Sequence, residues 1–287
     1  MKWARKIGSF FIGIIAATIA LAFIAGVLKN VEKPRSSQDF RSDSIPISST
    51  TEWNVYGRYT STHQRLWKDF KDRDHSLTYT VDYSQDRGSL DYKKRELEPY
   101  LDARQFWGSL YHFLHTQEQD KLAFLYTKID SARKVNKFNY KELAEYLVTF
   151  VQDIPYVLVI GSDCSNVGDP KLQDEVNRGI MPCVGNVPFG IHGPRKFLST
   201  LEGDCDTRSV LLFALLDHYN YATCILVSKQ YRHAVIGVKM RGYGMEKFFR
   251  GRTFKFWETT AYGFQVGEMA AHMRNIDFWN VVLYNEI

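Results

Sequence analysis

Cysteine is scarce in this sequence: the 287 residues include four, and no two of them form a CxxC pair. An HxxxH spacing is missing as well. The recurrent zinc-binding patterns are therefore absent, and we expect neither a metal ion nor an organic cofactor. A strong excess of one sign of charge is also lacking, because the sequence has 37 Lys and Arg residues and 32 Asp and Glu residues. One basic cluster, residues 241–255, lies among aromatics, and we interpret it as a solvated hairpin face. No nucleic-acid-binding module accompanies it, so we expect no nucleic acid partner.

Internal repeats are absent, and low complexity is confined to residues 29–51, a serine-rich stretch with two prolines. Its few apolar side chains predict a polar linker. The chain as a whole is 45% hydrophobic and 15% aromatic, which excludes general disorder and is enough for a large core. We expect four parts: an N-terminal stub and anchor (1–28), the linker (29–51), a hairpin and helical region (52–138), and a catalytic domain (139–287).

The N-terminal anchor is predicted from 22 uncharged residues, Ile7 to Leu28. A helix of that length crosses a hydrocarbon core of roughly 30 Å. A cleaved signal peptide is the alternative, since Ala20-Leu21-Ala22 has the small-x-small form of a cleavage site. The apolar run continues past that site through Phe23 and Ile24, which favours an uncleaved anchor. The membrane is thus one expected partner of the chain.

The orientation in the membrane is left open by the cations, because three precede the span and three follow it closely. A short N-terminal stub before a large C-terminal domain is typical of a signal anchor, which places the domain outside the cytoplasm. Cys164 and Cys183 lie in a loop rich in glycine, proline and asparagine, where a disulfide is one reading and two reduced surface thiols the other. A disulfide there agrees with an oxidising compartment.

The folded part is predicted to be of the α+β class. RLWKDF and SLTYTVDYS, on either side of KDRDH, predict a β-hairpin, and helix-like spacing of apolar residues begins near Pro99. Asn139 is expected to cap a helix through YKELAEYLVTFVQ. The segment SVLLFALLDHYNY is apolar on all sides and predicts a buried helix. Four extended segments after it predict an antiparallel sheet against which that helix packs: YATCILVS, HAVIGVK, TFKFWETT and DFWNVVLY.

A reactive cysteine is indicated by GDCDTRS, residues 203–209. This motif places Cys205 between two aspartates at the start of the buried helix. With Asp204 as N-cap, Cys205 falls in the first turn, where unpaired N–H groups and the helix dipole favour a thiolate. The aspartates oppose ionisation, so a reactive thiol needs a cationic partner. His233 opens a later strand and is the expected base, and Glu258 on the next strand is expected to orient it. We therefore expect Cys205 to have a pKa below the roughly 8.5 of free cysteine.

Three motifs in this order, LEGDCDTRSVLLFALLDHYNY, YRHAVIGV and WETTAYGFQVG, resemble the transglutaminase-like superfamily over about residues 140–267. The resemblance implies a papain-like fold with Cys205 as nucleophile, His233 as base and Glu258 as the orienting acid. It also matches Gln152 to Tyr156 with a helix-ending Q-x-x-x-Y segment, which makes Gln152 a candidate oxyanion donor beside the Cys205 backbone N–H. The chain departs from the family in its glutamate, where aspartate is commoner, and in a long, cysteine-bearing loop before Cys205.

The function predicted from these residues is that of a membrane-anchored cysteine enzyme. Its substrate would be a peptide or protein, its target an amide bond, and its intermediate a thioester, with hydrolysis favoured over transfer. Three alternatives stay open: a protein-glutamine acyl transferase, a non-catalytic relative that binds peptides in the same cleft, and a structural protein tethered to the membrane.

The anchor generates the first testable prediction. The full-length protein should sediment with membranes through residues 7–28 and be released by detergent but not by high salt or alkali, because an apolar helix is held by burial in hydrocarbon. Fractionation followed by N-terminal sequencing is the measurement. A mature N-terminus at Phe23 would instead identify a cleaved signal peptide.

Overall fold

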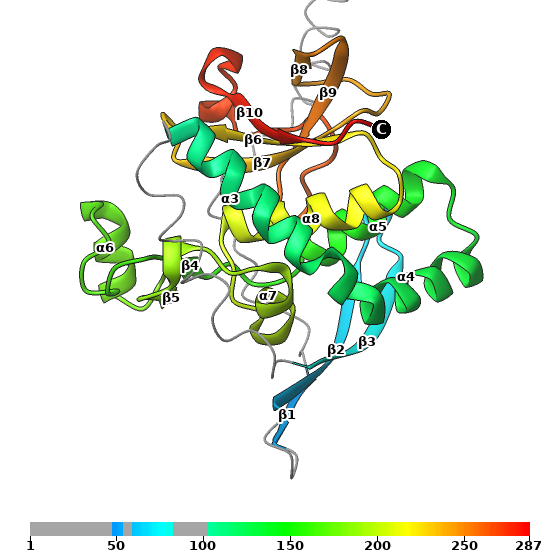
Figure 1. Ribbon diagram of the computed structural model, residues 1–287, viewed down its shortest axis with the longest axis horizontal. Helices are drawn as coiled ribbons and strands as arrows, with labels where there is room; N and C mark the ends of the chain where they lie inside the picture. Colours follow the sequence, from blue (N-terminus) through cyan, green and yellow to red (C-terminus); the bar gives the residue numbers. More distant parts are fainter. Residues whose placement is uncertain (1–47, 54–58, 83–102) are drawn as a thin grey trace, which may run out of the picture. The chain divides into compact units, whose positions relative to one another are not determined.

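The computed structural model describes residues 48–53, 59–82 and 103–287 (Figure 1). The anchor predicted over residues 7–28 lies outside these ranges and stays a prediction. Within them, no helix combines the length and the apolar character that a membrane span requires. The elements form a mixed α+β fold with antiparallel sheets and a helix packed on a sheet, so the predicted class is confirmed at this level.

A three-stranded antiparallel sheet begins the described chain, in the order β1 (Ser48–Trp53), β2 (Tyr59–Lys68) and β3 (Asp74–Asp82). The predicted hairpin is the β2–β3 pair, whose side chains alternate between core and solvent along β3. β1 includes residues 48–51, which the sequence assigned to the linker. Its serines and threonines lack an apolar pattern, but their backbone pairs with β2, as Thr50 does with Thr62.

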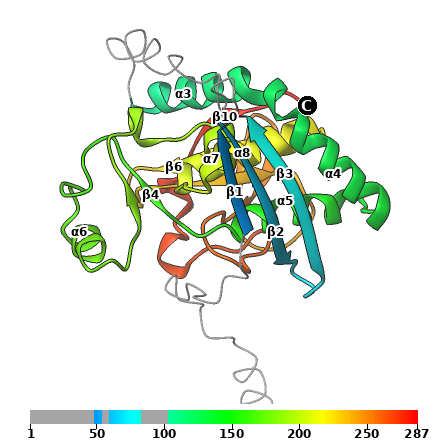
Figure 2. The same cartoon turned by 90° about the horizontal axis from the view of Figure 1, so that it is seen from below.

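Three helical segments follow: α3 (Ala103–Glu118) and α4 (Ala123–Asn136), joined by the short η1 (Gln119–Leu122), and then α5 (Tyr140–Gln152). α4 packs beside β3 (Figure 2). The predicted start of α5 is confirmed. Asn139 accepts from the Glu142 backbone N–H at 3.0 Å, and the Glu142 carboxylate accepts from the Asn139 N–H at 3.3 Å. This reciprocal capping box fixes the start of α5, and the chain leaves the helix just before Pro155.

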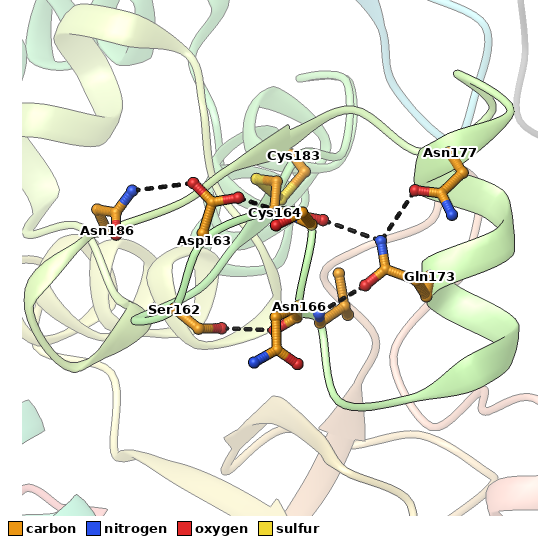
Figure 3. The surroundings of a disulfide bond; sticks show 10 residues. Ser162, Asp163, Cys164, Asn166, Gln173, Asn177, Cys183 and Asn186 are labelled. Carbon is orange, nitrogen blue, oxygen red and sulfur yellow. Dashed lines mark hydrogen bonds between the residues drawn. A yellow bond between two sulfur atoms is a disulfide. The ribbon is translucent and has the colours of Figure 1, made fainter.

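The cysteine-bearing loop contains β4 (Leu158–Val159), α6 (Pro170–Asn177) and β5 (Cys183–Val184), and it leads through η2 (Pro188–Gly190) to α7 (Pro194–Thr200). Cys164 and Cys183 form a disulfide (Figure 3), which decides between the two readings that the sequence left open, a bridge or two reduced thiols. The Gln173 amide supports the same loop, donating to the Cys164 carbonyl at 3.0 Å and accepting from the Val167 N–H at 2.8 Å. The loop is therefore tied to itself by one covalent bond and by side-chain hydrogen bonds.

The buried helix is α8 (Cys205–His218), in which residues 210–216 are all at most 2% exposed. It packs against β6 (Thr223–Ser228) and β7 (His233–Val238), and it also contacts α3, α5 and α7. The second sheet is antiparallel throughout and has the order β10-β6-β7-β9-β8. Its other strands are β8 (Glu246–Phe249), β9 (Arg252–Trp257) and β10 (Asn280–Tyr284); the turns η3 (Ala271–Met273) and η4 (Ile276–Phe278) precede β10.

Two expectations about organisation change with this fold. The buried core crosses the boundary expected at residue 138, since Trp67 and Tyr79 of the first sheet belong to one cluster with α5 and α8. Both parts bury their apolar faces on each other. The basic cluster lies largely on the β8–β9 hairpin, yet Lys255 is only 8% exposed and pairs with Glu246. That cation is buried and pairs with a half-exposed carboxylate, so it is not part of a solvated face.

The disulfide yields a stability prediction. Replacing both Cys164 and Cys183 by alanine should lower the free energy of unfolding by about 3 kcal/mol, because the bridge closes a loop of sequence separation 19 that the unfolded chain otherwise explores freely. Urea unfolding of the variant and the parent measures the difference, and peptide mapping of native material tests the linkage. Free thiols at both positions in native protein would contradict the bridge.

Candidate active site

Cys205 lies where the sequence predicts, at the first residue of α8. The N-cap Asp204 has extended backbone angles, and its carboxyl accepts from the Thr207 N–H at 3.3 Å. Gly203 has to be glycine here, because a Cβ would lie 2.7 Å from the Phe197 ring and from the Thr207 methyl group. The chain can therefore turn tightly into α8, and the Cys205 side chain is left 7% exposed.

His233 and Glu258 are brought together by the second sheet. β7 and β9 are neighbours in antiparallel register, with Ile236 opposite Trp257, so the first residue of β7 and the residue after β9 meet at one end. His233 Nε2 lies 2.9 Å from Glu258 Oε2 and 3.1 Å from Oε1. Both side chains are nearly buried, at 11% and 5% exposure.

The Glu258 carboxylate is held by more than the imidazole. Its Oε1 accepts from the backbone N–H groups of Thr259 and Thr260 at 2.8 and 2.9 Å, and from the Thr260 hydroxyl at 2.8 Å. Burial acts to raise the pKa of Glu258, but the charge and hydrogen bond of His233 and the bonds from Thr260 outweigh it and bring the pKa to about 2. Glu258 is therefore ionised at neutral pH and accepts a hydrogen from Nε2.

This pairing determines the state of the imidazole. Burial lowers the pKa of His233, but the Glu258 carboxylate, with smaller contributions from Asp206 and Asp204, raises it above the ordinary 6.5. Because Nε2–H is donated to Glu258, the neutral ring carries its lone pair on Nδ1, an assignment inferred from the hydrogen-bond network. The Trp279 ring, fully buried, lies 6.2 Å from the His233 ring centre.

The Cys205 thiol accepts a hydrogen bond from the backbone N–H of Ala234, the residue that follows His233 in β7. Its ionisation differs from the expectation. Burial raises the pKa of Cys205 well above the ordinary value, and Asp206 and Asp204 raise it further, while the Ala234 N–H lowers it only in part. The expected depressed pKa is contradicted: desolvation outweighs the helix terminus, and the resting group is a thiol.

The flanking aspartates are themselves perturbed. Burial, reinforced by Asp206, raises the pKa of Asp204 to about 8, so that this carboxyl is largely protonated at neutral pH. Burial also raises the pKa of Asp206, although the Tyr111 hydroxyl, which donates to its Oδ1, and nearby His233 lower it. The sequence suggests two negative charges beside the thiol. The structure places there one neutral carboxyl and one carboxyl held by a tyrosine from α3.

Gln152 lies close to this site but is oriented away from an oxyanion role. Its amide nitrogen donates to the Glu258 carbonyl at 2.7 Å and to the Phe264 carbonyl at 2.9 Å. Both amide hydrogens are used, so the geometry does not support the oxyanion assignment. Its Oε1 has no hydrogen-bond partner within the described ranges. The backbone N–H of Cys205 remains a donor for an oxyanion, because the first N–H groups of a helix have no intrahelical acceptor.

Sequence reasoning missed two side chains that hydrogen-bond to residues neighbouring the site. Tyr111 comes from α3, far from the motifs, and no local pattern marks it. Arg208 is in the quoted motif, and a signal was available: a guanidinium in a helix that is expected to be buried must find partners for five donors. Over the residues that the structure describes, no group of three or more His, Cys, Asp or Glu side chains is arranged to hold a metal ion.

Comparisons of the chain with protein-family models, with curated proteins and with solved structures found no match. The resemblance to the transglutaminase-like superfamily is therefore a hypothesis that depends on the three motifs alone.

The raised pKa of Asp204 generates a pH prediction. Asp204 binds its proton more tightly in the folded protein than in the unfolded chain. Its contribution to the stability of the fold is therefore full below the unfolded pKa of 3.8 and is lost as pH rises through the folded pKa of about 8. Asp204→Asn keeps an N-cap acceptor but has no proton to lose. The variant should exceed the parent in stability at pH 9 by about 1–3 kcal/mol, the usual cost of a poorly satisfied buried group.

Urea unfolding at pH 6 and pH 9 measures this difference. Asp174→Asn is the matched control, because Asp174 is 63% exposed in its side chain and should change stability equally at both values. If the parent and Asp204→Asn lose stability in parallel between pH 6 and pH 9, Asp204 does not hold the proton.

Proposed function

We propose that this chain is a cysteine enzyme that cleaves amide or peptide bonds through a thioester on Cys205, with His233 as general base and Glu258 as the orienting acid. The observation that carries the proposal is the 2.9 Å contact between His233 Nε2 and Glu258, together with a cysteine at a helix N-terminus whose thiol accepts from the N–H of the residue after His233. A nucleophile, a base and an orienting acid from three separate segments are what acyl transfer by a thiol requires. The resemblance to the transglutaminase-like superfamily supports the same roles.

The resting thiol determines how the first step would proceed. The Cys205 sulfur attacks the substrate carbonyl carbon while its proton moves to His233 Nδ1, so that charge separates during the attack and not before it. The tetrahedral oxyanion is stabilised by the Cys205 backbone N–H at the start of α8. The imidazolium that forms is stabilised by ionised Glu258, whose pKa of about 2 keeps it charged throughout.

The second half of the reaction returns the enzyme to its starting state. The imidazolium gives its proton to the leaving amine as the C–N bond breaks, which leaves a thioester on Cys205 and neutral His233. Water then attacks the thioester, with one of its protons passing to Nδ1, and the acid product leaves as the proton returns to sulfur. The cycle consumes one amide bond and one water molecule and needs no cofactor.

Hydrolysis is favoured over transfer on physical grounds. Both reactions share the thioester, but transfer requires an amine to outcompete water at roughly 55 M, which takes a channel that excludes solvent. The fold class serves both reactions, so it does not decide between them. Protein-glutamine acyl transfer is thus the nearest alternative reaction of the same site.

A second candidate function is favoured by one observation. The pKa of the Cys205 thiol is raised well above its ordinary value, which a non-catalytic relative that binds peptides in the same cleft would tolerate. The organised His233–Glu258 pair favours the enzyme, because a binding cleft has no need for an oriented base.

The setting of the proposed enzyme is a membrane, with the folded residues outside the cytoplasm. The predicted apolar span supports the anchor, and the Cys164–Cys183 disulfide supports an oxidising compartment. The partners are then the bilayer and a peptide or protein substrate.

The test uses full-length protein in detergent with glutamine-bearing peptides and a labelled primary amine. Cleavage or deamidation without amine incorporation is expected, and Cys205→Ala should abolish it. His233→Ala should slow it by at least about 100-fold, the usual scale for a lost general base. Mass spectrometry reads both products. Incorporation that depends on Cys205 would replace hydrolysis by transfer, and turnover that survives Cys205→Ala would contradict the proposal.

A further inference from the structure

Arg208 is the most completely engaged side chain near the site. It is 0% exposed, and each of its five N–H donors meets a backbone carbonyl. The bonds run from Nε to Gly203 at 3.1 Å, from Nη1 to Val151 at 2.9 Å and Thr259 at 3.4 Å, and from Nη2 to Ile154 at 2.6 Å and Pro155 at 2.7 Å. The rings of Tyr156 and Phe197 each lie 5.7 Å from the guanidinium carbon.

These carbonyls belong to three separate segments. Val151, Ile154 and Pro155 form the C-terminal end of α5 and the turn that follows it. Gly203 lies two residues before Cys205, and Thr259 directly follows Glu258. The planar guanidinium of Arg208 therefore connects two segments, the one just before Cys205 and the one just after Glu258, to the C-terminal end of α5. Its fork of fixed donors suits this task, since each carbonyl must stay in place for its bond to form.

Gln152 makes a second connection from the same helix end. Its amide joins α5 to the carbonyl of Glu258 itself and to that of Phe264. We name Arg208 and Gln152 together the carbonyl clamp. Both side chains are buried, and neither hydrogen-bonds to the side chain of Cys205, His233 or Glu258.

The segments that the clamp holds lie outside the helices and strands and make few backbone hydrogen bonds, such as the one from the Val157 N–H to the Gly203 carbonyl at 3.3 Å. Residues 201–204 and 258–259 belong to no helix or strand. They lack the ladder of hydrogen bonds that fixes β7 and α8, yet they carry the residues that border the nucleophile and the acid. Side-chain donors aimed at their carbonyls supply the missing support.

We propose that Arg208 and Gln152 are positioning residues, which fix the segments that carry Cys205 and Glu258 on the end of α5 and so hold the thiol and the His233–Glu258 pair in a constant geometry. The inference rests on the proposed function, and it assigns Gln152 a role other than the oxyanion donor implied by the resemblance. A displacement of about 1 Å between reacting groups can cost about 100-fold in rate, so the clamp should govern reactivity as well as stability.

The test measures alkylation of Cys205 by iodoacetamide in the full-length protein, as a function of pH. In this reaction the sulfur displaces iodide and forms a C–S bond, and no oxyanion develops. A residue that only donates to an oxyanion therefore leaves the rate unchanged, whereas a residue that positions the thiol or its base changes it. Peptide mapping separates Cys205 from Cys224, which is buried in β6 and serves as the unreactive internal reference.

Wild type and His233→Ala come first. If His233→Ala alkylates at the wild-type rate, the proposed function is overturned, and the positioning role that rests on it is overturned as well. Given a His233-dependent rate, Arg208→Lys should lower that rate by about tenfold or more at pH 7, because lysine keeps the charge but cannot reach five carbonyls. Arg65→Lys is the matched control: Arg65 is also 0% exposed and also donates to the end of α5, at Phe150 and Asp153, but within the described residues it has no hydrogen bond to residues 201–204 or 258–259.

Arg65→Lys should lower the melting temperature as Arg208→Lys does, yet alkylate within about twofold of wild type. A folded Arg208→Lys that alkylates as wild type does, with the same pH profile, overturns the inference. Where Arg208→Lys fails to fold, Gln152→Met decides, since it removes the other half of the clamp. A slowed alkylation supports positioning. A wild-type alkylation rate in Gln152→Met overturns the inference.

Discussion

The hydrogen bond between His233 Nε2 and Glu258 is the interaction on which the rest of the site depends. It keeps the carboxylate ionised in a buried place, assigns the imidazole hydrogen to Nε2, and leaves Nδ1 as the basic atom. The pairing of β7 with β9 brings the two residues together, and the bonds from Thr259 and Thr260 keep the carboxylate from turning. Without this bond, His233 would have no fixed tautomer.

The burial of α8 imposes the opposite constraint. A helix that is surrounded by protein gives Cys205 a firm position but removes the water that a thiolate would need, so the pKa of the thiol rises. The same desolvation keeps a proton on Asp204 and moves Asp206 towards the neutral form. The site is therefore closer to neutral than its sequence suggests, and the one firmly ionised acid is Glu258. A base that acts during the attack fits this environment better than a preformed ion pair.

Local patterns were enough to predict the features that have local causes. Asn139 and Glu142 mark a helix start wherever they occur at this spacing, Asp204 does the same for α8, and alternating side chains mark the β2–β3 hairpin. The order of Cys205, His233 and Glu258 also carried over into space, because neighbouring antiparallel strands return the chain to the same edge. The carbonyl clamp, the Tyr111–Asp206 bond and the raised pKa of Cys205 were not predictable in this way. The first two depend on segments separated by 50 residues or more, and the third depends on the exclusion of water. Neither cause can be seen in a short stretch of sequence.

The proposed role of His233 as a base, with its tautomer and basicity set by Glu258, is tested most directly by a ¹⁵N NMR titration of the histidine side chains, which needs no substrate. His233 should titrate above 6.5, its neutral form should carry hydrogen on Nε2, and Glu258→Gln should lower its pKa by removing the facing negative charge. A His233 that titrates at or below 6.5 in the wild type, or whose titration is unchanged by Glu258→Gln, would contradict this role.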